Sequence, residues 1–309
     1  GIPARGLRRT ARQTATMAPG SPPGQGKPAE LATHHDGTRA AVPSTSIATC
    51  WMRAAESKKP AGERLIFDPF AERLCGGQEP DLSWIPKSGL PRDFWVDLGA
   101  VRTRWIDEVL AAAEPKQLVI LGAGLDARAC RLEALRGVPV FELDFPEVLE
   151  AKWGLLGAHA AIAELRRVPA NLGMDDWVSK LLSAGFAAEE PSVWLLEGLT
   201  GYLTPEELDA LLRQISSAAA PGSAMAVTFV GSGLTSMHRS LFREERDVEA
   251  LLAQHGWSAA ATGLPAVAAR YGRAGNMPPD WKYFLATASR RPSSTAAAAE
   301  RGAPVRASL

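Results

Sequence analysis

The chain has 309 residues and 46% of them are hydrophobic, so it is long enough to bury a substantial core. Because its 34 basic and 34 acidic residues balance, the charge gives no indication of binding to nucleic acid or to an anionic membrane. No apolar run has the length of a transmembrane helix. The three cysteines and five histidines are scattered without metal-ligand spacing, so we expect no metal site and a reducing compartment, the cytoplasm.

Both ends of the chain are predicted to be disordered tails. Residues 1–44 are rich in Gly, Pro, Ala, Thr and Arg without sustained periodicity, and residues 291–309 are rich in Ser, Ala and Arg. No acidic residue precedes Glu30, so an organellar targeting segment is the alternative for the first tail. Between the tails we expect a single domain, with a helical cap at 45–113 and an α/β core at 117–290.

The first part of the domain is predicted to be helical. Residues 47–57 form the first expected helix. Asp68 before Pro69 is typical of an N-cap followed by proline at the first helical position, which predicts a second helix. A longer helix is expected at residues 93–113.

This third helix carries an arginine on its apolar face. Trp105, Ile106 and Val109 form an apolar stripe at helical spacing, and Arg102 lies four residues before Ile106 on the same stripe. Arg104 instead shares a face with Glu108 at the spacing of a solvated ion pair. Because an inward guanidinium needs an anion, Arg102 is expected either in an internal salt bridge or as a clamp on a ligand carboxylate.

A short apolar run at 117–121 ends abruptly in Gly122-Ala123-Gly124, and residues 126–136 are compatible with a helix. This order is typical of a buried strand that leads through a tight loop into a helix. Glycines suit the loop because they adopt positive φ and let ligand atoms approach the backbone closely. The N–H groups at the start of the following helix would favour a polar ligand.

Strands and helices then alternate along the chain. The predicted strands are 138–143, 165–168, 193–196, 224–230 and 283–288, and the predicted helices are 146–156, 174–184, 205–219 and 247–255. Alternation of this kind indicates a parallel sheet with right-handed crossovers. The helix at 205–219 is preceded by Thr204 and contains Glu207, the pair of a capping box.

Four polar features fall at the carboxyl ends of the predicted strands: the Gly122 and Gly124 loop, Asp144, Asn171 and Glu197. Ligands of open parallel sheets bind outside these ends. The sequence therefore predicts one ligand site at this edge of the sheet, with the Asp144 carboxylate in position to bind a ribose.

The glycine pattern alone fits both a nicotinamide dinucleotide and S-adenosylmethionine. Two charges distinguish these ligands. Arg102 suits a ligand with a carboxylate, and Glu197 suits a ligand with a cationic amine, because an acid there would oppose a pyrophosphate. The methionine end of S-adenosylmethionine carries both groups, which favours it as the cofactor.

The sequence resembles the leucine carboxyl methyltransferase family, particularly its bacterial-type members, which include polyketide carboxyl O-methyltransferases. The similarity runs from about residue 47 to residue 290. It rests on Arg53-Ala54-Ala55-Glu56, Asp68-Pro69-Phe70-Ala71, Arg102-Thr103-Arg104, Ile106-Asp107, Leu121-Gly122-Ala123-Gly124-Leu125-Asp126-Ala127-Arg128, Glu142-Leu143-Asp144-Phe145-Pro146-Glu147-Val148, Glu197-Gly198-Leu199, Tyr202-Leu203 and Pro221-Gly222-Ser223.

The resemblance implies a Rossmann-like class I methyltransferase, an α/β fold with a mostly parallel seven-stranded sheet, helices on both faces and an N-terminal helical cap. It also implies S-adenosylmethionine as the methyl donor. By this resemblance, Arg102 would bind the methionine carboxylate with help from Arg53, and Glu197 would lie near the methionine amino group. Gly122 and Gly124 would line the methionyl and adenosyl groups. Asp144 would bind the ribose, and Asn171 and Leu172 would flank the adenine. The family usually has Asp-Leu where this chain has Asn171-Leu172.

The expected reaction is O-methylation of a carboxylate or phenolic hydroxyl on a small molecule. A carboxylate is ionised at neutral pH and needs no general base, whereas a phenol with a pKa of about 10 does. The candidates for a catalytic side chain are Tyr202 and His238, the latter in a predicted lid insert at 231–243. The alternatives are a nicotinamide-dependent oxidoreductase and a non-catalytic protein that keeps the methyltransferase fold.

Overall fold

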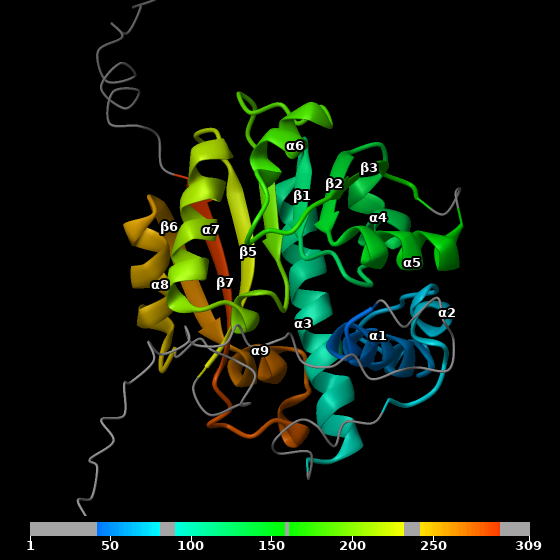
Figure 1. Ribbon diagram of the computed structural model, residues 1–309. Helices are drawn as coiled ribbons and strands as arrows, with labels where there is room; N and C mark the ends of the chain where they lie inside the picture. Colours follow the sequence, from blue (N-terminus) through cyan, green and yellow to red (C-terminus); the bar gives the residue numbers. More distant parts are fainter. Residues whose placement is uncertain (1–41, 81–89, 158–160, 232–241, 291–309) are drawn as a thin grey trace, which may run out of the picture. The chain divides into compact units, whose positions relative to one another are not determined.

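The computed structural model describes residues 42–80, 90–157, 161–231 and 242–290, and within these ranges the chain forms one seven-stranded sheet (Figure 1). The strand order is β3-β2-β1-β4-β5-β7-β6. Strands β1 to β5 pair in parallel, and β7 runs antiparallel to both of its neighbours. The strands are β1 (Leu118–Leu121), β2 (Pro139–Asp144), β3 (Glu164–Pro169), β4 (Val193–Leu196), β5 (Ala224–Val230), β6 (Trp257–Gly263) and β7 (Tyr283–Arg290).

Helices cover both faces of this sheet. The described helices are α1 (Ser44–Ser57), α2 (Ala71–Cys75), α3 (Arg92–Ala113), α4 (Arg128–Arg131), α5 (Pro146–Leu156), α6 (Trp177–Ser183), α7 (Pro205–Ala218), α8 (Glu245–Gln254) and α9 (Leu264–Arg270). Short 3-10 turns are η1 (Glu133–Leu135), η2 (Thr200–Tyr202) and η3 (Ala274–Asn276). Alternate residues of β1 enter different cores: Leu118 and Ile120 pack with α1, α3, α5 and α9, whereas Val119 and Leu121 pack with α6, α7 and α8.

The N-terminal helices pack closely on one another, and α1 contacts both α2 and α3. A glycine on α3 permits the closest approach, because a Cβ atom added at Gly99 would lie only 2.5 Å from the Cβ of Met52 on α1. Any side chain at Gly99 would therefore push the two helices apart. This packing brings α1 to the carboxyl ends of the strands, where the candidate site lies.

The predicted fold class is confirmed, including the seven strands, the mostly parallel pairing and the helices on both faces. The boundaries predicted for α5, β4 and β5 agree with the structure residue for residue. The capping box at Thr204 is also present, with hydrogen bonds in both directions between Thr204 and Glu207. The division into a domain and two tails stays a prediction, because residues 1–41 and 291–309 lie outside the described residues.

Several predicted elements were wrong in extent. The helix predicted at 126–136 divides into the four-residue α4 and the 3-10 turn η1, with Leu132 in extended conformation between them. The helix predicted from residue 174 begins at Trp177, because the side chain of Asp176 caps it by accepting from Ser179 N. Helix α2 begins at Ala71 rather than at Pro69, although Asp68 still accepts from the backbone N–H groups of Phe70 and Ala71.

The prediction from sequence located no element between residues 256 and 282, where the structure has β6 and α9. Strand β6 pairs with β7 along its full length at the edge of the sheet. No helix in the described part of the chain is both long enough and apolar enough to cross a membrane.

Candidate functional site

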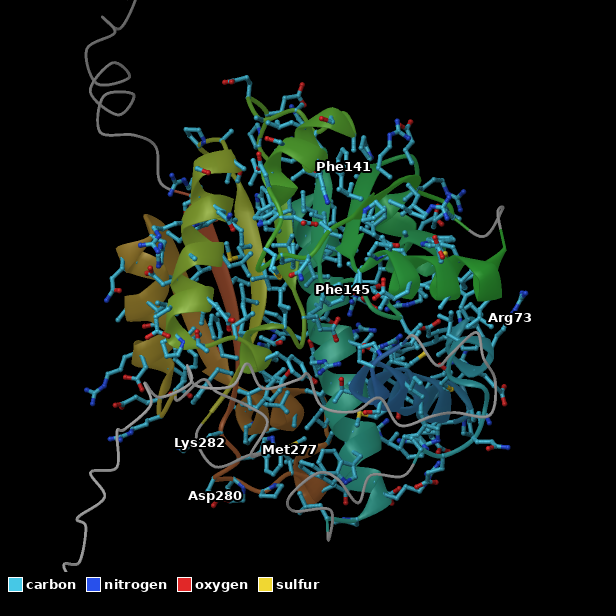
Figure 2. The ribbon with its side chains drawn as sticks, in the orientation of Figure 1. Arg73, Phe141, Phe145, Met277, Asp280 and Lys282 are labelled. Atoms are coloured by element: carbon cyan, nitrogen blue, oxygen red, sulfur yellow. The ribbon has the colours of Figure 1, made fainter. Side chains whose placement is uncertain are left out.

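The order of the strands creates a switch point between β1 and β4. The chain builds β1, β2 and β3 outward in one direction and then returns to place β4 on the other side of β1. Crevices outside the carboxyl ends of strands at such a point are the usual ligand sites of open parallel sheets. Phe141 lies within β2 and Phe145 at its carboxyl end, and this end faces the helices α1 and α3 (Figure 2).

The glycine loop after β1 is closely packed by the side chains of neighbouring elements. Gly122 and Gly124 have φ values of 68° and 43°. A Cβ atom at Gly122 would lie 3.3 Å from Leu199 Cδ1, and one at Gly124 would lie 2.9 Å from Ser46 Oγ. Both positions therefore need glycine for backbone conformation and for close approach of neighbouring elements.

Asp144, at the end of β2, lies next to the glycine loop. Its Oδ2 accepts from Gly124 N at 2.7 Å and its Oδ1 accepts from Phe145 N at 2.8 Å. Burial raises the pKa of Asp144, in opposition to these two N–H donors, which lower it. The two hydrogen bonds fix the orientation of the carboxylate and leave each oxygen a further lone pair for a ligand hydroxyl.

Asn171 and Leu172 follow β3 at the same edge of the sheet, and Ala170 N donates to Asp144 O. The side-chain oxygen of Asn171 accepts from Gly173 N at 3.0 Å, and its backbone N–H donates to Asp175 Oδ2 at 2.9 Å. The residue thus closes a turn through its own side-chain oxygen. An aspartate could close the same turn, so the substitution of amide for carboxylate leaves the loop conformation intact.

Arg102 and Glu197 lie together at the end of β4. Arg102 Nε is 2.6 Å from Glu197 Oε1, and only 6% of Arg102 is exposed. Arg102 also donates through Nη1 to the hydroxyl of Tyr283 at 3.2 Å. The inward orientation predicted for Arg102 is confirmed, and both interpretations from the sequence, an internal salt bridge and a ligand clamp, remain compatible with its position.

The contact between Arg102 and Glu197 is close in distance but lacks hydrogen-bond geometry. Among the described residues, neither Arg102 Nε nor Glu197 Oε1 has a hydrogen-bond partner, although both atoms are buried. Buried polar atoms in this condition are rare, and each calls for an explanation. This arrangement fits a zwitterionic ligand, whose carboxylate would accept a hydrogen bond from Arg102 Nε and whose ammonium group would donate one to Glu197 Oε1.

Arg128 holds the second oxygen of Glu197. Its Nη1 lies 2.5 Å from both Glu197 Oε2 and Asp126 Oδ2, and its Nε lies 2.7 Å from Asp107 Oδ1. Arg131 adds a further contact to Asp107 at 2.7 Å. The sequence predicts no separate role for Arg128, although Asp126 and Arg128 directly after the glycine loop are a visible signal.

Arg53 reaches the glycine loop from α1. Its Nη2 donates to Leu125 O at 2.6 Å, its Nε lies 3.0 Å from Asp68 Oδ2, and its Nη1 donates to Thr49 O. All three nitrogens of the guanidinium are thus engaged with protein groups. The structure shows Arg53 bracing the loop, and its direct contact with a ligand carboxylate stays a prediction.

A buried ion pair supports the same loop from α5. Lys152 and Glu142 are completely buried, with Lys152 Nζ 2.8 Å from Glu142 Oε2. Trp153 Nε1 donates to the same oxygen at 2.9 Å, and Lys152 Nζ donates to Asp126 O at 2.9 Å. Sequence reasoning missed this role, although a glutamate within an apolar strand was a visible signal.

Of the two residues predicted as catalytic candidates, only Tyr202 lies within the described part of the chain. Tyr202 lies in η2 with 39% of its surface exposed, and its hydroxyl interacts with the Thr45 side chain near Arg102 and Tyr283. Burial raises the pKa of Tyr202, so it is a phenol at neutral pH. His238 and most of the predicted lid insert lie outside the described residues.

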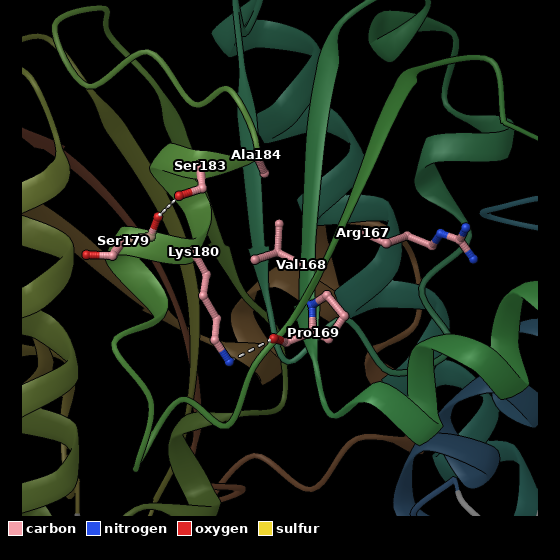
Figure 3. A pocket seen from close by; sticks show the side chains of 7 residues that line it. All are labelled: Arg167, Val168, Pro169, Ser179, Lys180, Ser183 and Ala184. Atoms are coloured by element: carbon pink, nitrogen blue, oxygen red, sulfur yellow. Dashed lines mark hydrogen bonds between the residues drawn. The ribbon is translucent and has the colours of Figure 1, made fainter.

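Two cavities in the described part of the chain lie away from the predicted site residues. One of about 440 Å³ lies between the edge strand β3 and α6, where Lys180 Nζ donates to Pro169 O (Figure 3). Another of about 300 Å³ is lined by residues 65–67, α3 and Leu132. The second is also lined by Arg104, Asp107 and Glu108, but neither is lined by Asp144 or Glu197. No cluster of three or more metal-ligating side chains occurs within the described ranges.

The model of the leucine carboxyl methyltransferase family matches residues 46–216. The chain belongs to the leucine carboxyl methyltransferase family. A Mycobacterium tuberculosis H37Ra protein is 36% identical over 267 residues, covering 75% of this chain and 85% of its own length. A Saccharopolyspora erythraea protein is 40% identical over 190 residues, covering 59% and 66%. Each is named "Putative S-adenosyl-L-methionine-dependent methyltransferase".

Solved structures agree on the fold of this family member. A "putative methyltransferase" from Thermobifida fusca YX has a TM-score of 0.54 at 16% identity, covering 83% of this chain and 98% of its own. A Streptomyces avermitilis protein of the duf574 family has a TM-score of 0.53 at 14% identity, covering 82% and 99%. Together the comparisons confirm the predicted family, fold and cofactor, and they favour methyl transfer over the nicotinamide alternative.

Proposed function

We propose that this leucine carboxyl methyltransferase family member transfers a methyl group from S-adenosylmethionine to an oxygen of a small molecule, with a carboxylate as the favoured acceptor. The observation that carries the cofactor site is the Arg102 and Glu197 pair, whose buried donor and acceptor atoms lie beside each other without a hydrogen bond. The methionine end of the cofactor offers a carboxylate to the one and an ammonium to the other.

The other site residues supply the remaining contacts of this proposal. Asp144, oriented by Gly124 N and Phe145 N, would accept from the ribose hydroxyls. Asn171 and Leu172, at the adjacent strand end, would flank the adenine. Gly122 and Gly124 would let the cofactor approach the backbone, since neither carries a side chain.

When bound, S-adenosylmethionine supplies a methyl group that is already activated on a sulfonium. The protein therefore has to bind the cofactor and the acceptor, orient them for transfer and exclude water from the site. Arg102 and Glu197 would fix one end of the cofactor at β4, and Asp144 would fix the middle at β2. Tyr202 in η2 and Tyr283 in β7 lie near Arg102 and would border this site.

A carboxylate acceptor fits the titrating groups near the site. A carboxylate is already a nucleophile at neutral pH, whereas a phenol has to lose a proton to a base. Tyr202 has a raised pKa and carries its own proton at neutral pH, so it is suited to donate a hydrogen bond to an acceptor oxygen rather than to remove a proton.

The test is transfer of radiolabelled methyl from S-adenosylmethionine to a matched panel of carboxylic acids and phenols. We expect base-labile methyl ester products with carboxylates. Label in phenol ethers alone would overturn the carboxylate assignment. Absence of cofactor binding by calorimetry would overturn the methyltransferase activity itself. Labelling of a protein fraction in place of small molecules would overturn the small-molecule acceptor.

A further inference from the structure

Two guanidinium groups from different helices hold Glu197, one at each oxygen. Arg102 on α3 approaches Oε1 at 2.6 Å without hydrogen-bond geometry, and Arg128 on α4 donates to Oε2 at 2.5 Å. The two contacts are therefore unequal. The contact from Arg102 is the one that a ligand can replace, whereas the contact from Arg128 is a formed hydrogen bond.

The remaining contacts of the two arginines reinforce this difference. Arg102 has one further described hydrogen bond, to the Tyr283 hydroxyl. Arg128 is held by Asp107 on α3 and by Asp126 in the loop before α4, and only 2% of its side chain is exposed. Arg128 is thus fixed in place by two carboxylates of its own. Its Nη2 is buried without a hydrogen-bond partner among the described residues, but the other two nitrogens are fully engaged, whereas Arg102 lacks a hydrogen bond at the Nε that faces Glu197.

Glu197 depends on these neighbours for its charge. The charged groups that face it are Arg102 from α3, Arg128 from α4 and Arg53 from α1, with Asp126 from the loop opposing them. If a ligand carboxylate takes up Arg102, Glu197 loses one of its two contacting cations. A buried carboxylate without a cation would take up a proton and lose its attraction for an ammonium group.

We propose that Arg128 is a positioning residue of the cofactor site, which holds Glu197 in place as a carboxylate while Arg102 engages the carboxylate of the cofactor. This inference rests on the proposed function, because it concerns the same S-adenosylmethionine site. Arg128 acts through Glu197 and does not itself touch the cofactor.

The titration of Glu197 supports this assignment. Burial raises the pKa of Glu197, but Arg128 contributes the largest lowering, followed by Arg102 and Arg53, and the pKa lies well below its usual range. Without Arg128, only Arg102 and Arg53 would counteract the increase in the pKa of Glu197 that burial causes. The pKa of Glu197 would then move upward, toward pH values at which proteins are studied.

The test is calorimetric binding of S-adenosylmethionine between pH 5 and pH 7 to the wild-type chain, Arg128→Met and Arg128→Lys. The cofactor amine stays protonated in this range because α-amino groups titrate near pH 8. 5′-Methylthioadenosine is the control ligand, since it keeps the adenosine and lacks the amino-acid end. It also corrects for any titration of Asp144, which faces the ribose in both ligands.

For the wild type we expect a Kd for S-adenosylmethionine that changes less than about twofold between pH 5 and pH 7. For Arg128→Met we expect a Kd weakened at least about tenfold at pH 7 and severalfold further at pH 5, because a raised pKa lets Glu197 take up a proton as the pH falls. Arg128→Lys should recover part of both losses. Binding of 5′-methylthioadenosine should stay within about twofold of wild type in every variant.

Two results would overturn the inference. One is a flat pH profile in Arg128→Met, and the other is an equal loss of affinity for both ligands. Adding Glu197→Gln to Arg128→Met should abolish the pH dependence, and its persistence would count equally against Glu197 as the titrating group. If Arg128→Met fails to fold, Arg128→Lys decides by the same criteria. A wild-type chain that binds neither ligand would instead refute the proposed function.

Discussion

Lys152 on α5 donates to the main-chain oxygen of Asp126 at 2.9 Å, so a buried ammonium group ties the helix after β2 to the glycine loop after β1. The same ammonium lies 2.8 Å from Glu142, which is also completely buried. The loop is thereby supported from β2 and α5 on one side and by Arg53 of α1 on the other.

Lys152→Met should destabilise the chain by about 3–5 kcal/mol at pH 7, because it leaves Glu142 buried without its counter-charge. Burial already raises the pKa of Glu142, and loss of Lys152 raises it further. The folded variant therefore favours protonated Glu142, so its deficit should shrink as pH falls from 7 toward 5. Urea unfolding at both pH values measures this. Lys152→Met with Glu142→Leu is the matched control and should recover most of the loss, and a deficit that is independent of pH would contradict the explanation.

Arg102→Met should weaken binding of S-adenosylmethionine by at least about tenfold, because it removes the charge-assisted hydrogen bond proposed for the cofactor carboxylate. Binding of 5′-methylthioadenosine, which has no carboxylate, should change less than about twofold. Calorimetry with both ligands makes the measurement. Arg104→Met is the matched control, since Arg104 lies two residues away in an exposed pair with Glu108. Equal weakening of both ligands would indicate general disruption instead of a lost carboxylate contact.

Gly124→Ala should lower stability by about 1–3 kcal/mol and weaken cofactor binding, because φ is 43° and the new Cβ atom meets Ser46 Oγ at 2.9 Å. Adding Ser46→Gly removes the clash and should restore part of the stability. Gly137→Ala is the control, because its φ of 69° carries a similar conformational penalty with nothing within 4 Å of the added atom. Urea unfolding and calorimetry report the two effects, and a Gly124→Ala variant no worse than Gly137→Ala would refute the steric argument.

Cys75 should react with iodoacetamide before the other two described cysteines. Cys75 and Cys130 are 6% and 5% exposed, so accessibility does not separate them. Hydrogen bonding with the Cys50 thiol lowers the pKa of Cys75 to about 7, whereas burial raises the pKa of Cys130 to about 12. Burial also raises the pKa of Cys50.

Because the thiolate is the nucleophile, the alkylation rate of Cys75 should rise with pH through about 7 and then level off. Mass spectrometry of peptides after timed labelling measures the rate at each cysteine. Cys50→Ala should shift the midpoint for Cys75 upward by removing the hydrogen bond. Labelling of Cys130 at the same rate as Cys75 would show that local opening, and not thiolate content, controls the reaction.

The parallel strands and the position of the site at their carboxyl ends were predictable, because short stretches of sequence specify them. The apolar run of β4 and the capping box at Thr204 each specify an element from a few neighbouring residues. Strand β6 gave no comparable signal. Three of its seven residues are alanines, and its pairing with β7 supplies what its own side chains do not.

The partners of the charged residues were less predictable than their positions. Helical spacing placed Arg102 on the inward face of α3, and the structure agrees. The spacing could not show that Glu197, 95 residues later, has Arg128 at its other oxygen, because that contact depends on how α3, α4 and β4 pack. Glu142 is conspicuous within an apolar strand, but its partner Lys152 was missed for the same reason, because a lysine on a helix is usually at the surface.

Arg53 belongs to α1, yet the carbonyl that it grips belongs to the turn after β1, and Asp68 holds the same guanidinium from the segment before α2. A chimaera that receives its first two helices from a relative therefore also receives the residues at positions 53 and 68, which support the glycine loop in this chain. Such grafts should keep cofactor affinity only when arginine and aspartate are transferred together. The inward corner formed by Arg53 and Asp68 therefore limits which first helices this chain can accept from a relative.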